Sequence, residues 1–185
     1  RDLRMSRGLG DVYKRQDVMN IKKVSVDKEG TGMGWGAVYA QYLESMDQIG
    51  EQGNGLSVSR QLYKGDEALN ESAPLKVGDK ITVRLTVKAD RDMDFVQIKD
   101  DRAACMEPLQ AVSGFRWSNG LGYYQATKDA STQFFIDQMR KGTYVIEYQV
   151  YVNRTGEYQA GIATVQSAYA PEFGGHTGGY RVMVE

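Results

Sequence analysis

The only cysteine of the chain, Cys105, lies in a tetrapeptide that differs by one residue from a reactive sequence. It is followed by Met106, Glu107 and Pro108, which gives the pattern C-x-E-P. The pattern C-x-E-Q forms an internal thioester, in which the cysteine sulfur bonds to the side-chain carboxamide carbon of the glutamine. Pro108 has no carboxamide, so this tetrapeptide cannot form the bond. Arg102 is outnumbered by acidic neighbours, so nothing nearby lowers the thiol pKa, and the sequence predicts a buried structural thiol.

A run of aspartates further upstream has the spacing of calcium ligands in an EF-hand loop. The aspartates that match the ligand positions are Asp90, Asp92, Asp94 and Asp101. Phe95 occupies the sixth position, where the sharp turn of that loop needs glycine, and no helix pattern flanks the run. The sequence therefore favours a solvated turn between strands, with Arg91 as an ionic partner, over a calcium site.

His176 is the only histidine and lies in the glycine-rich sequence GGHTGG. One histidine and one cysteine are too few for a zinc site, which needs three or four protein ligands. The same shortage argues against a Ser-His-Asp or Cys-His catalytic arrangement. No phosphate loop or dinucleotide-binding sequence is present. We therefore expect no metal site, no cofactor and no catalytic residue.

The aromatic group in FRWSNGLGYY has two possible uses. Its members are Phe115, Trp117, Tyr123 and Tyr124. A row of aromatic rings on a sheet can stack against sugars, but aromatic side chains also bury the most area per residue in a core. The general tendency of aromatic residues toward burial favours the core.

Charge and composition narrow the class of protein. The chain has 23 basic and 24 acidic residues and a formal net charge of −1, so it lacks the basic surface expected of a nucleic-acid-binding protein. A single cysteine excludes an intramolecular disulfide. No apolar run approaches the roughly 18 residues of a membrane span.

The elements that must position these residues are strands. Alternating apolar and polar residues with turn sequences between them predict an all-β fold, an antiparallel sandwich of two sheets with about seven strands and little helix. The clearest alternation is at residues 81–87, where Ile81, Val83, Leu85 and Val87 point to one face. The other predicted strands are residues 24–26, 35–44, 56–63, 93–100, 134–136, 143–152, 157–170 and 180–185.

The first part of the chain reads differently from the rest. Residues 1–16 resemble the translation of a sequencing adapter, so we expect a non-native or disordered leader and a fragment of a longer protein. Residues 51–55 are the most linker-like stretch. Three regions thus remain: residues 17–50, the linker at 51–55, and a folded domain over 56–185.

Four motifs within residues 56–185 carry a resemblance to a known family. In order they are the strand after Gly78-Asp79, RDMDFVQ, GTYV-x-EY and YAPEF. With them, this part of the chain resembles the C-terminal macroglobulin-like domain of bacterial alpha-2-macroglobulins. The sequence WGAVYAQYLE resembles the end of the CUB-type segment that precedes this domain, so residues 17–50 are expected to be its remnant.

The resemblance implies a β-sandwich of the macroglobulin or receptor-binding-domain type in an endopeptidase inhibitor that entraps proteases. In the family this domain is not catalytic, packs on the thioester domain and helps to keep water from the reactive bond. The residues that match the thioester-facing loop are Ala168, Tyr169, Ala170, Pro171, Glu172 and Phe173. Related sequences often have Met at the position of Ala168, which here leaves a smaller plug.

The implied partners are the thioester and CUB-type domains of the same parent chain and, through the parent, target proteases. The implied location is the bacterial cell envelope, either periplasmic or associated with the outer membrane. No nucleic acid and no membrane insertion by this fragment are expected. The alternative function is an envelope adhesion or carbohydrate-binding module that uses the aromatic group at residues 115–124. An enzyme is the weakest option, because no set of acid, base and nucleophile is visible.

Overall fold

The computed structural model describes residues 4–5, 12–13, 27, 29–34, 51–70 and 73–185 of the chain. The chain divides into two compact units, Arg1–Leu43 and Glu44–Glu185. In the first unit, β1 (Arg4–Met5) pairs antiparallel with β2 (Val12–Tyr13). The predicted leader over residues 1–16 is therefore not wholly irregular, because two of its segments exchange backbone hydrogen bonds. The strands predicted at residues 24–26 and 35–44 lie outside the described residues.

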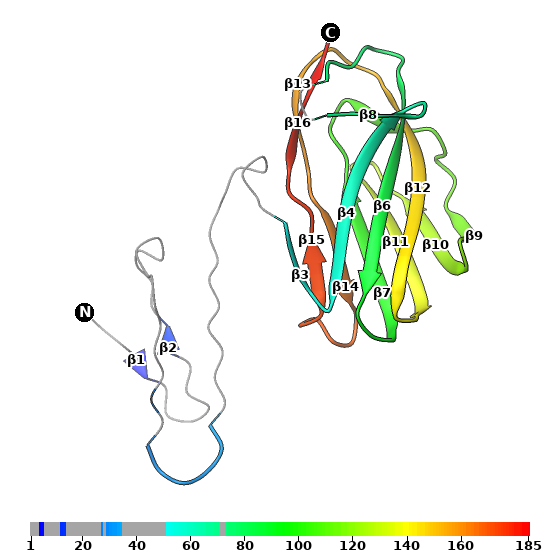
Figure 1. Ribbon diagram of the computed structural model, residues 1–185. Coiled ribbons are helices and arrows are strands. Elements are labelled where there is room, and N and C mark those ends of the chain that lie inside the picture. Colours follow the sequence, from blue (N-terminus) through cyan, green and yellow to red (C-terminus); the bar gives the residue numbers. More distant parts are fainter. Residues whose placement is uncertain (1–3, 6–11, 14–26, 28, 35–50, 71–72) are drawn as a thin grey trace. The chain divides into compact units, whose positions relative to one another are not determined.

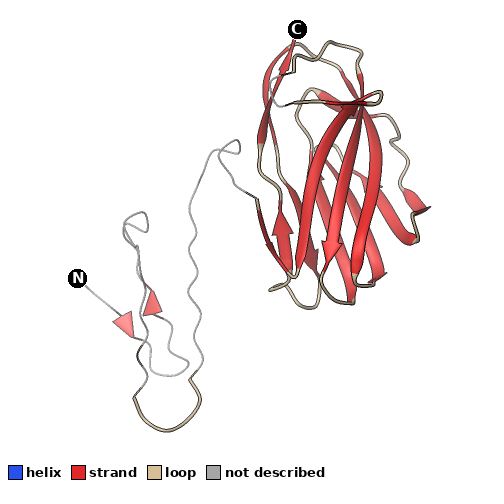
Figure 2. Ribbon diagram, in the orientation of Figure 1, coloured by secondary structure: helices blue, strands red, loops and turns tan. Residues whose placement is uncertain are grey.

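The second unit is an antiparallel β-sandwich, which confirms the predicted fold class, and its described residues contain no helix (Figures 1 and 2). One sheet runs in the order β8 (Met106–Pro108), β12 (Gly142–Val152), β6 (Lys80–Ala89) and β4 (Leu56–Lys64), with β5 (Glu67–Ala68) beside β4. The other runs in the order β14 (Ala163–Ser167), β7 (Met93–Asp101), β11 (Ser131–Met139), β10 (Leu121–Thr127) and β9 (Gly114–Ser118). A small third sheet pairs β13 (Gly156–Ala160) with β16 (Tyr180–Val184).

Two short strands connect the sheets into one hydrogen-bonded path. β3 (Gln52–Asn54) pairs with β4 on one side and with β15 (Gly174–His176) on the other, and β15 pairs with β14. The backbones approach closely here: a Cβ atom on Gly175 would lie 2.7 Å from the carbonyl oxygens of both Gln52 and Leu56. The prediction of a linker at residues 51–55 is therefore wrong for residues 52–54. These three residues, Gln52, Gly53 and Asn54, contain no apolar side chain and so no alternation, and the sequence gives no strand signal for them.

The core lies between the two sheets and follows the alternation seen in the sequence. All four inward residues of β6 are buried, as predicted. The expected strand at residues 134–136 is longer than predicted, because β11 extends over Ser131–Met139 and buries Phe134, Ile136 and Met139. Each such side chain contributes about 1.5–3 kcal/mol by leaving water. The sandwich has more strands than the seven or so expected, since segments of two or three residues such as β5 and β8 escape periodicity.

A tight turn joins β9 to β10 and decides which way their side chains face. Ser118 pairs with Leu121, and the two residues between them, Asn119 and Gly120, have φ angles of 49° and 79°. Positive φ at both central residues is the requirement of a type I′ hairpin turn, and Asn-Gly is its preferred sequence. The turn fixes the register of the hairpin, and with it the face on which each aromatic residue of this segment lies.

Candidate functional site

The predicted interface residues, 168–173, form the loop between β14 and β15 at one end of the sandwich (Figure 1). Backbone hydrogen bonds close the loop: Ser167 N–H donates to the Phe173 carbonyl at 3.0 Å, and Phe173 N–H donates to the Ala170 carbonyl at 2.9 Å. Asn54 Nδ2, on β3, donates to the Glu172 carbonyl at 2.7 Å. The loop is thus fixed at both of its ends and in its second half.

Phe173 holds the loop against the core of the domain. Its ring packs against the core, and a Cβ atom placed on Gly55 would lie 2.7 Å from its Cδ1. Gly55 has a φ of 70°, so both the space and the backbone conformation require glycine there. On its other side, the Arg91 guanidinium lies 4.6 Å from the centre of the Phe173 ring. This places a cation over an aromatic face, a favourable contact.

Tyr169 projects in the opposite sense, into solvent. It is 78% exposed and meets Phe95, itself 47% exposed, in an edge-to-face contact with ring centres 5.0 Å apart and an interplanar angle of 81°. Ala168 N–H, one residue before Tyr169, donates to the Phe95 carbonyl at 2.9 Å, so a backbone hydrogen bond also holds the loop beside Phe95. The result is a rigid aromatic pair on the surface rather than a single mobile ring.

Phe95 is the residue of this site that the sequence reasoning missed. Its φ of 54° is unusual for a bulky side chain and costs on the order of 1–3 kcal/mol. The cost is offset because Phe95 lies in β7, where Asp94 and Val96 on either side of it keep their pairing with β11. No sequence signal marked it, because a bulky residue within a strand pattern is expected to have a negative φ.

The aspartate run forms separate contacts instead of one cluster. Asp90 pairs with Arg91 at 2.8 Å, which confirms the predicted partner, and the hydrogen bond from Arg91 lowers the pKa of the Asp90 carboxyl. Asp92 accepts a hydrogen bond from Lys141 N–H at 2.7 Å, and Asp101 pairs with Lys99 at 2.9 Å. Among the described residues no three His, Cys, Asp or Glu side chains converge in a way that would hold a metal ion.

Cys105 is fully buried, which confirms the prediction of a structural thiol. Burial raises the pKa of this thiol, so it is less reactive than an exposed one. The next three residues, Met106–Pro108, form β8 at the edge of a sheet. His176 lies in β15, one of the two short strands that connect the sheets, and its Nδ1 lies 3.1 Å from the Thr177 carbonyl oxygen.

The aromatic group at residues 115–124 divides between core and surface. Tyr123 is 5% exposed and packs in the core as predicted. Phe115 and Trp117 are 84% and 76% exposed, so the prediction of core packing is wrong for both. Alternation explains the split, because the register set by the Asn119-Gly120 turn puts residues 115 and 117 on the outer face.

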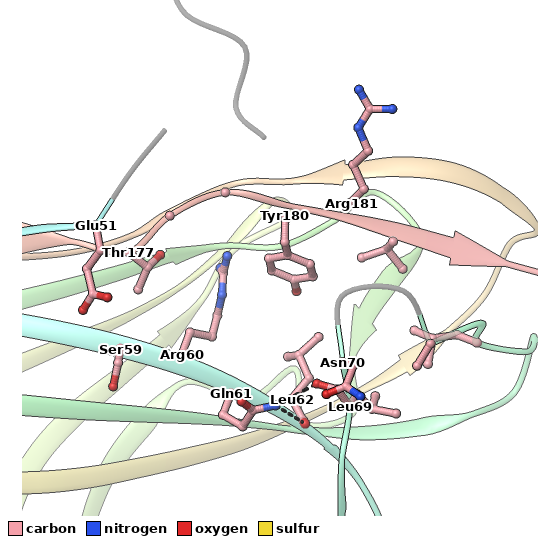
Figure 3. Close-up of a pocket in the computed structure, with 15 residues that line it drawn as sticks. Glu51, Ser59, Arg60, Gln61, Leu62, Leu69, Asn70, Thr177, Tyr180 and Arg181 are labelled. Atoms are coloured by element: carbon pink, nitrogen blue, oxygen red, sulfur yellow. Dashed lines mark hydrogen bonds between the residues drawn. The ribbon is translucent and has the colours of Figure 1, made fainter. Parts of the chain in front are cut away.

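A cavity of about 340 Å³ lies between β4 and the segment that leads into β16 (Figure 3). The side chains of Arg60 and Tyr180 both lie in its wall, with the guanidinium 4.6 Å from the centre of the Tyr180 ring. Burial raises the pKa of the Tyr180 phenol, which keeps the ring neutral. The Arg60 guanidinium thus lies in the wall of the cavity, but it already forms an ion pair with Asp100.

Arg60 forms a buried ion pair with Asp100, and their side chains are 5% and 1% exposed. Arg60 Nη2 also donates to the Gly161 carbonyl at 2.5 Å, and the Tyr148 hydroxyl donates to Asp100 Oδ2 at 2.7 Å. Burial raises the pKa of the Asp100 carboxyl, and Arg60 and Tyr148 oppose that rise. Burial acts to lower the pKa of Arg60, but the Asp100 carboxylate raises it above its ordinary value. The cluster joins β4 and β12 of one sheet to β7 of the other.

Comparison with known protein families identifies this sandwich. The bacterial alpha-2-macroglobulin MG10 domain matches residues 55–172, more than half of the 185 residues. The chain belongs to this MG10 domain family. The match begins at Gly55, beneath Phe173, and ends at Glu172 within the candidate loop. The resemblance seen in the sequence is confirmed at the level of the family.

Solved structures show the same MG10-like fold. Salmonella alpha-2-macroglobulin reacted with methylamine is similar with a TM-score of 0.62 and 19% identity, over 74% of this chain and 10% of that one. Native Escherichia coli alpha-2-macroglobulin from domain MG7 to the C-terminus is similar with a TM-score of 0.61 and 17% identity, over 73% of this chain and 24% of that one.

One curated relative comes from Dictyostelium discoideum. Circularly permutated Ras protein 2 of Dictyostelium discoideum is 28% identical over 166 residues, which is 86% of this chain and 4% of that protein. The MG10-family chain therefore spans only a small part of each of these relatives.

Proposed function

We propose that this chain is a non-catalytic domain of a bacterial alpha-2-macroglobulin-like endopeptidase inhibitor, and that its loop at residues 168–173 packs on the thioester domain of the parent protein. The observation that carries the proposal is the exposed pair of Tyr169 and Phe95 on an otherwise fixed loop. A thioester persists only where water is excluded, and two large rings held edge to face provide a dry, preorganised cover.

Each residue at the loop has a separate role in the proposed contact. Tyr169 supplies the contact area and Phe95 holds it in place. Phe173 and Arg91 fix the loop to the body of the domain, so that little conformational freedom is lost when the loop meets its partner. Ala168 lies at the base of Tyr169 and adds little bulk of its own.

Several features of the parent follow from this assignment. We propose that residues 17–50 belong to the preceding CUB-type segment and that residues 56–185 form the macroglobulin domain. The partners are then the thioester and CUB-type domains of the same chain and, through the parent, the proteases that it entraps. The proposed location is the bacterial cell envelope. No helix among the described residues has the length and apolar character to cross a membrane.

The experiment requires the upstream reading frame, expressed together with this chain as one protein. If the upstream part encodes a helical thioester domain with C-x-E-Q, the rate at which methylamine releases the free thiol measures how well the thioester is covered. Tyr169→Ala is expected to accelerate that release several-fold. The matched control is Tyr151→Ala, which removes a partly exposed tyrosine from β12, away from the loop. Equal release rates in Tyr169→Ala and the unsubstituted protein would overturn the proposed role of the loop.

A further inference from the structure

The outer face of the β9–β10 hairpin carries two aromatic rings that the fold leaves in solvent. Phe115 and Trp117 are the most exposed large aromatic residues of β9, and they stand two residues apart on one strand. They therefore project from the same face of the sheet. That face is opposite to the one on which Tyr123 packs into the core, so neither ring is needed to fill the sandwich.

Strand register extends the exposed aromatics into a row. Phe115 is paired with Tyr124 on β10, and Tyr124 is paired with Phe135 on β11. The rings of Phe115 and Tyr124 meet edge to face with centres 5.1 Å apart. Phe135 is partly exposed next to them. Because the row crosses three adjacent strands, its ends are about 10 Å apart.

Trp117 lies beside this row and packs closely against its cross-strand partner, a glycine. Trp117 is paired with Gly122, and a Cβ atom placed on Gly122 would lie 2.9 Å from both Cε3 and Cζ3 of the indole. One edge of the indole thus contacts the backbone of β10, and most of the ring is exposed to solvent. An exposed aromatic ring that is held at one edge can stack against a ligand.

Polar groups border the aromatic surface, and none of those on the hairpin is a free cation. The Tyr124 hydroxyl has no hydrogen-bond partner among the described residues. Asp137 is exposed and follows Phe135 by two residues, so it projects from the same face of β11. Arg116 is turned the other way, where its Nε donates to Gln125 at 3.1 Å. The surface therefore offers ring faces, a hydroxyl and a carboxylate, and it does not suit an anionic ligand.

From these observations we propose that the outer face of the hairpin is a binding site for neutral oligosaccharides of β-linked hexopyranoses. The axial C–H groups of one sugar ring stack on Trp117 and those of the next on Phe115. Asp137 and Tyr124 accept and donate hydrogen bonds to the sugar hydroxyls. This activity goes beyond the proposed function, because it does not involve the 168–173 loop.

The test titrates the folded 185-residue chain with chitohexaose and, separately, with cellohexaose, and follows backbone amide and indole signals by NMR. We expect saturable shifts confined to residues 115–124 and 135–137, and the stronger response of the two sugars identifies the preferred hexose. Trp117→Ala should weaken binding about tenfold. Gly122→Ala should also weaken binding, although Trp117 is still present, because the added methyl group displaces the indole. Tyr169→Ala is the matched control: it removes an exposed aromatic residue elsewhere and should leave binding unchanged.

Three results would overturn the proposal. The first is the absence of saturable shifts with either sugar up to its solubility limit. The second is an affinity for the sugar that is unchanged in Trp117→Ala. The third is self-association of the chain through this face, detected by sedimentation and lost in Trp117→Ala, without sugar binding, since the surface would then be an interface between copies.

Discussion

Removing one partner of the ion pair between Arg60 and Asp100 should cost more stability than the loss of any other polar contact described above. Arg60 extends from β4 across the core to Asp100 on β7, so the pair joins the two sheets. Arg60→Met removes the guanidinium but keeps most of the apolar stem. It leaves the Asp100 carboxylate buried with the Tyr148 hydroxyl as its remaining side-chain donor.

The expected magnitudes differ between variants. Breaking a buried pair by removing one partner costs about 3–5 kcal/mol, so Arg60→Met should lose that much free energy of unfolding at pH 7. Tyr148→Phe keeps the ion pair and removes one hydrogen bond to a charged group, which costs about 1–3 kcal/mol. The double variant of Arg60→Met with Asp100→Leu leaves no buried charge. It should lose clearly less than the sum of the two single substitutions.

Acid should partly rescue Arg60→Met. Burial raises the pKa of Asp100, and Arg60 opposes the rise, so without Arg60 the carboxyl takes up a proton more readily in the folded state. A raised carboxyl pKa in the folded state favours folding below that pKa and disfavours it above. The difference in unfolding free energy between Arg60→Met and the parent chain should therefore narrow as the pH falls from 7 toward 4.

The assay is urea unfolding followed by far-UV circular dichroism at each pH. A loss below about 1 kcal/mol in Arg60→Met at pH 7, or strict additivity in the double variant, would refute the reasoning. If Arg60→Met does not fold, Tyr148→Phe still measures the hydrogen bond to Asp100, and a double variant that folds shows that the unpaired buried carboxylate is what unfolds Arg60→Met.

Three further predictions concern other parts of the second unit. Asp79 accepts hydrogen bonds from Lys64 Nζ and Lys76 N–H, and these lower the pKa of its carboxyl. Asp79→Asn should therefore reduce the Tm by a few degrees at pH 7, and this difference should vanish as the pH falls through the folded-state pKa of Asp79. Thermal scans that show the same difference at pH 7 and pH 2 would contradict this prediction. Cys105 should not react with a disulfide reagent in the folded chain at pH 8 and should react fully in guanidinium; fast labelling of the folded chain would contradict its burial. Deleting residues 1–50 should leave a cooperative thermal transition, because β3 and every core residue that the structure describes follow residue 50; a transition lost by calorimetry would refute this boundary.

The sequence predicted those parts of the fold that depend on long alternating strands. β6 and β12 each carry an apolar face of regular period, and in both the buried residues are those that alternation selects. β3 and β15 were not foreseen, because glycine and polar residues have no periodic pattern and their pairing depends on close backbone approach. Pairing of that kind depends on the neighbouring strands on both sides rather than on the sequence of the segment itself.

The candidate site was predicted only in part for a related reason. The motif YAPEF located the loop, but Phe95 is far from it in sequence and joins it through strand pairing and an edge-to-face contact. The exposure of Trp117 was misjudged, because composition favours burial of aromatic rings while the Asn119-Gly120 turn dictates the face. Arg60 and Asp100 gave no sequence signal, since each is an ordinary surface residue type until the two sheets close over them.

The connection of the two sheets through β3 and β15 couples the 168–173 loop to the rest of the sandwich. β15 begins at Gly174, directly after the loop, and Asn54 on β3 holds the Glu172 carbonyl. A force on the loop therefore acts directly on the backbone hydrogen bonds of β15, which join the two sheets. A partner that grips the loop should slow amide hydrogen exchange in β3 and β15, and a force that pulls the loop away should open the domain along this line first. The three-residue strands β3 and β15 would then be the first to separate under load.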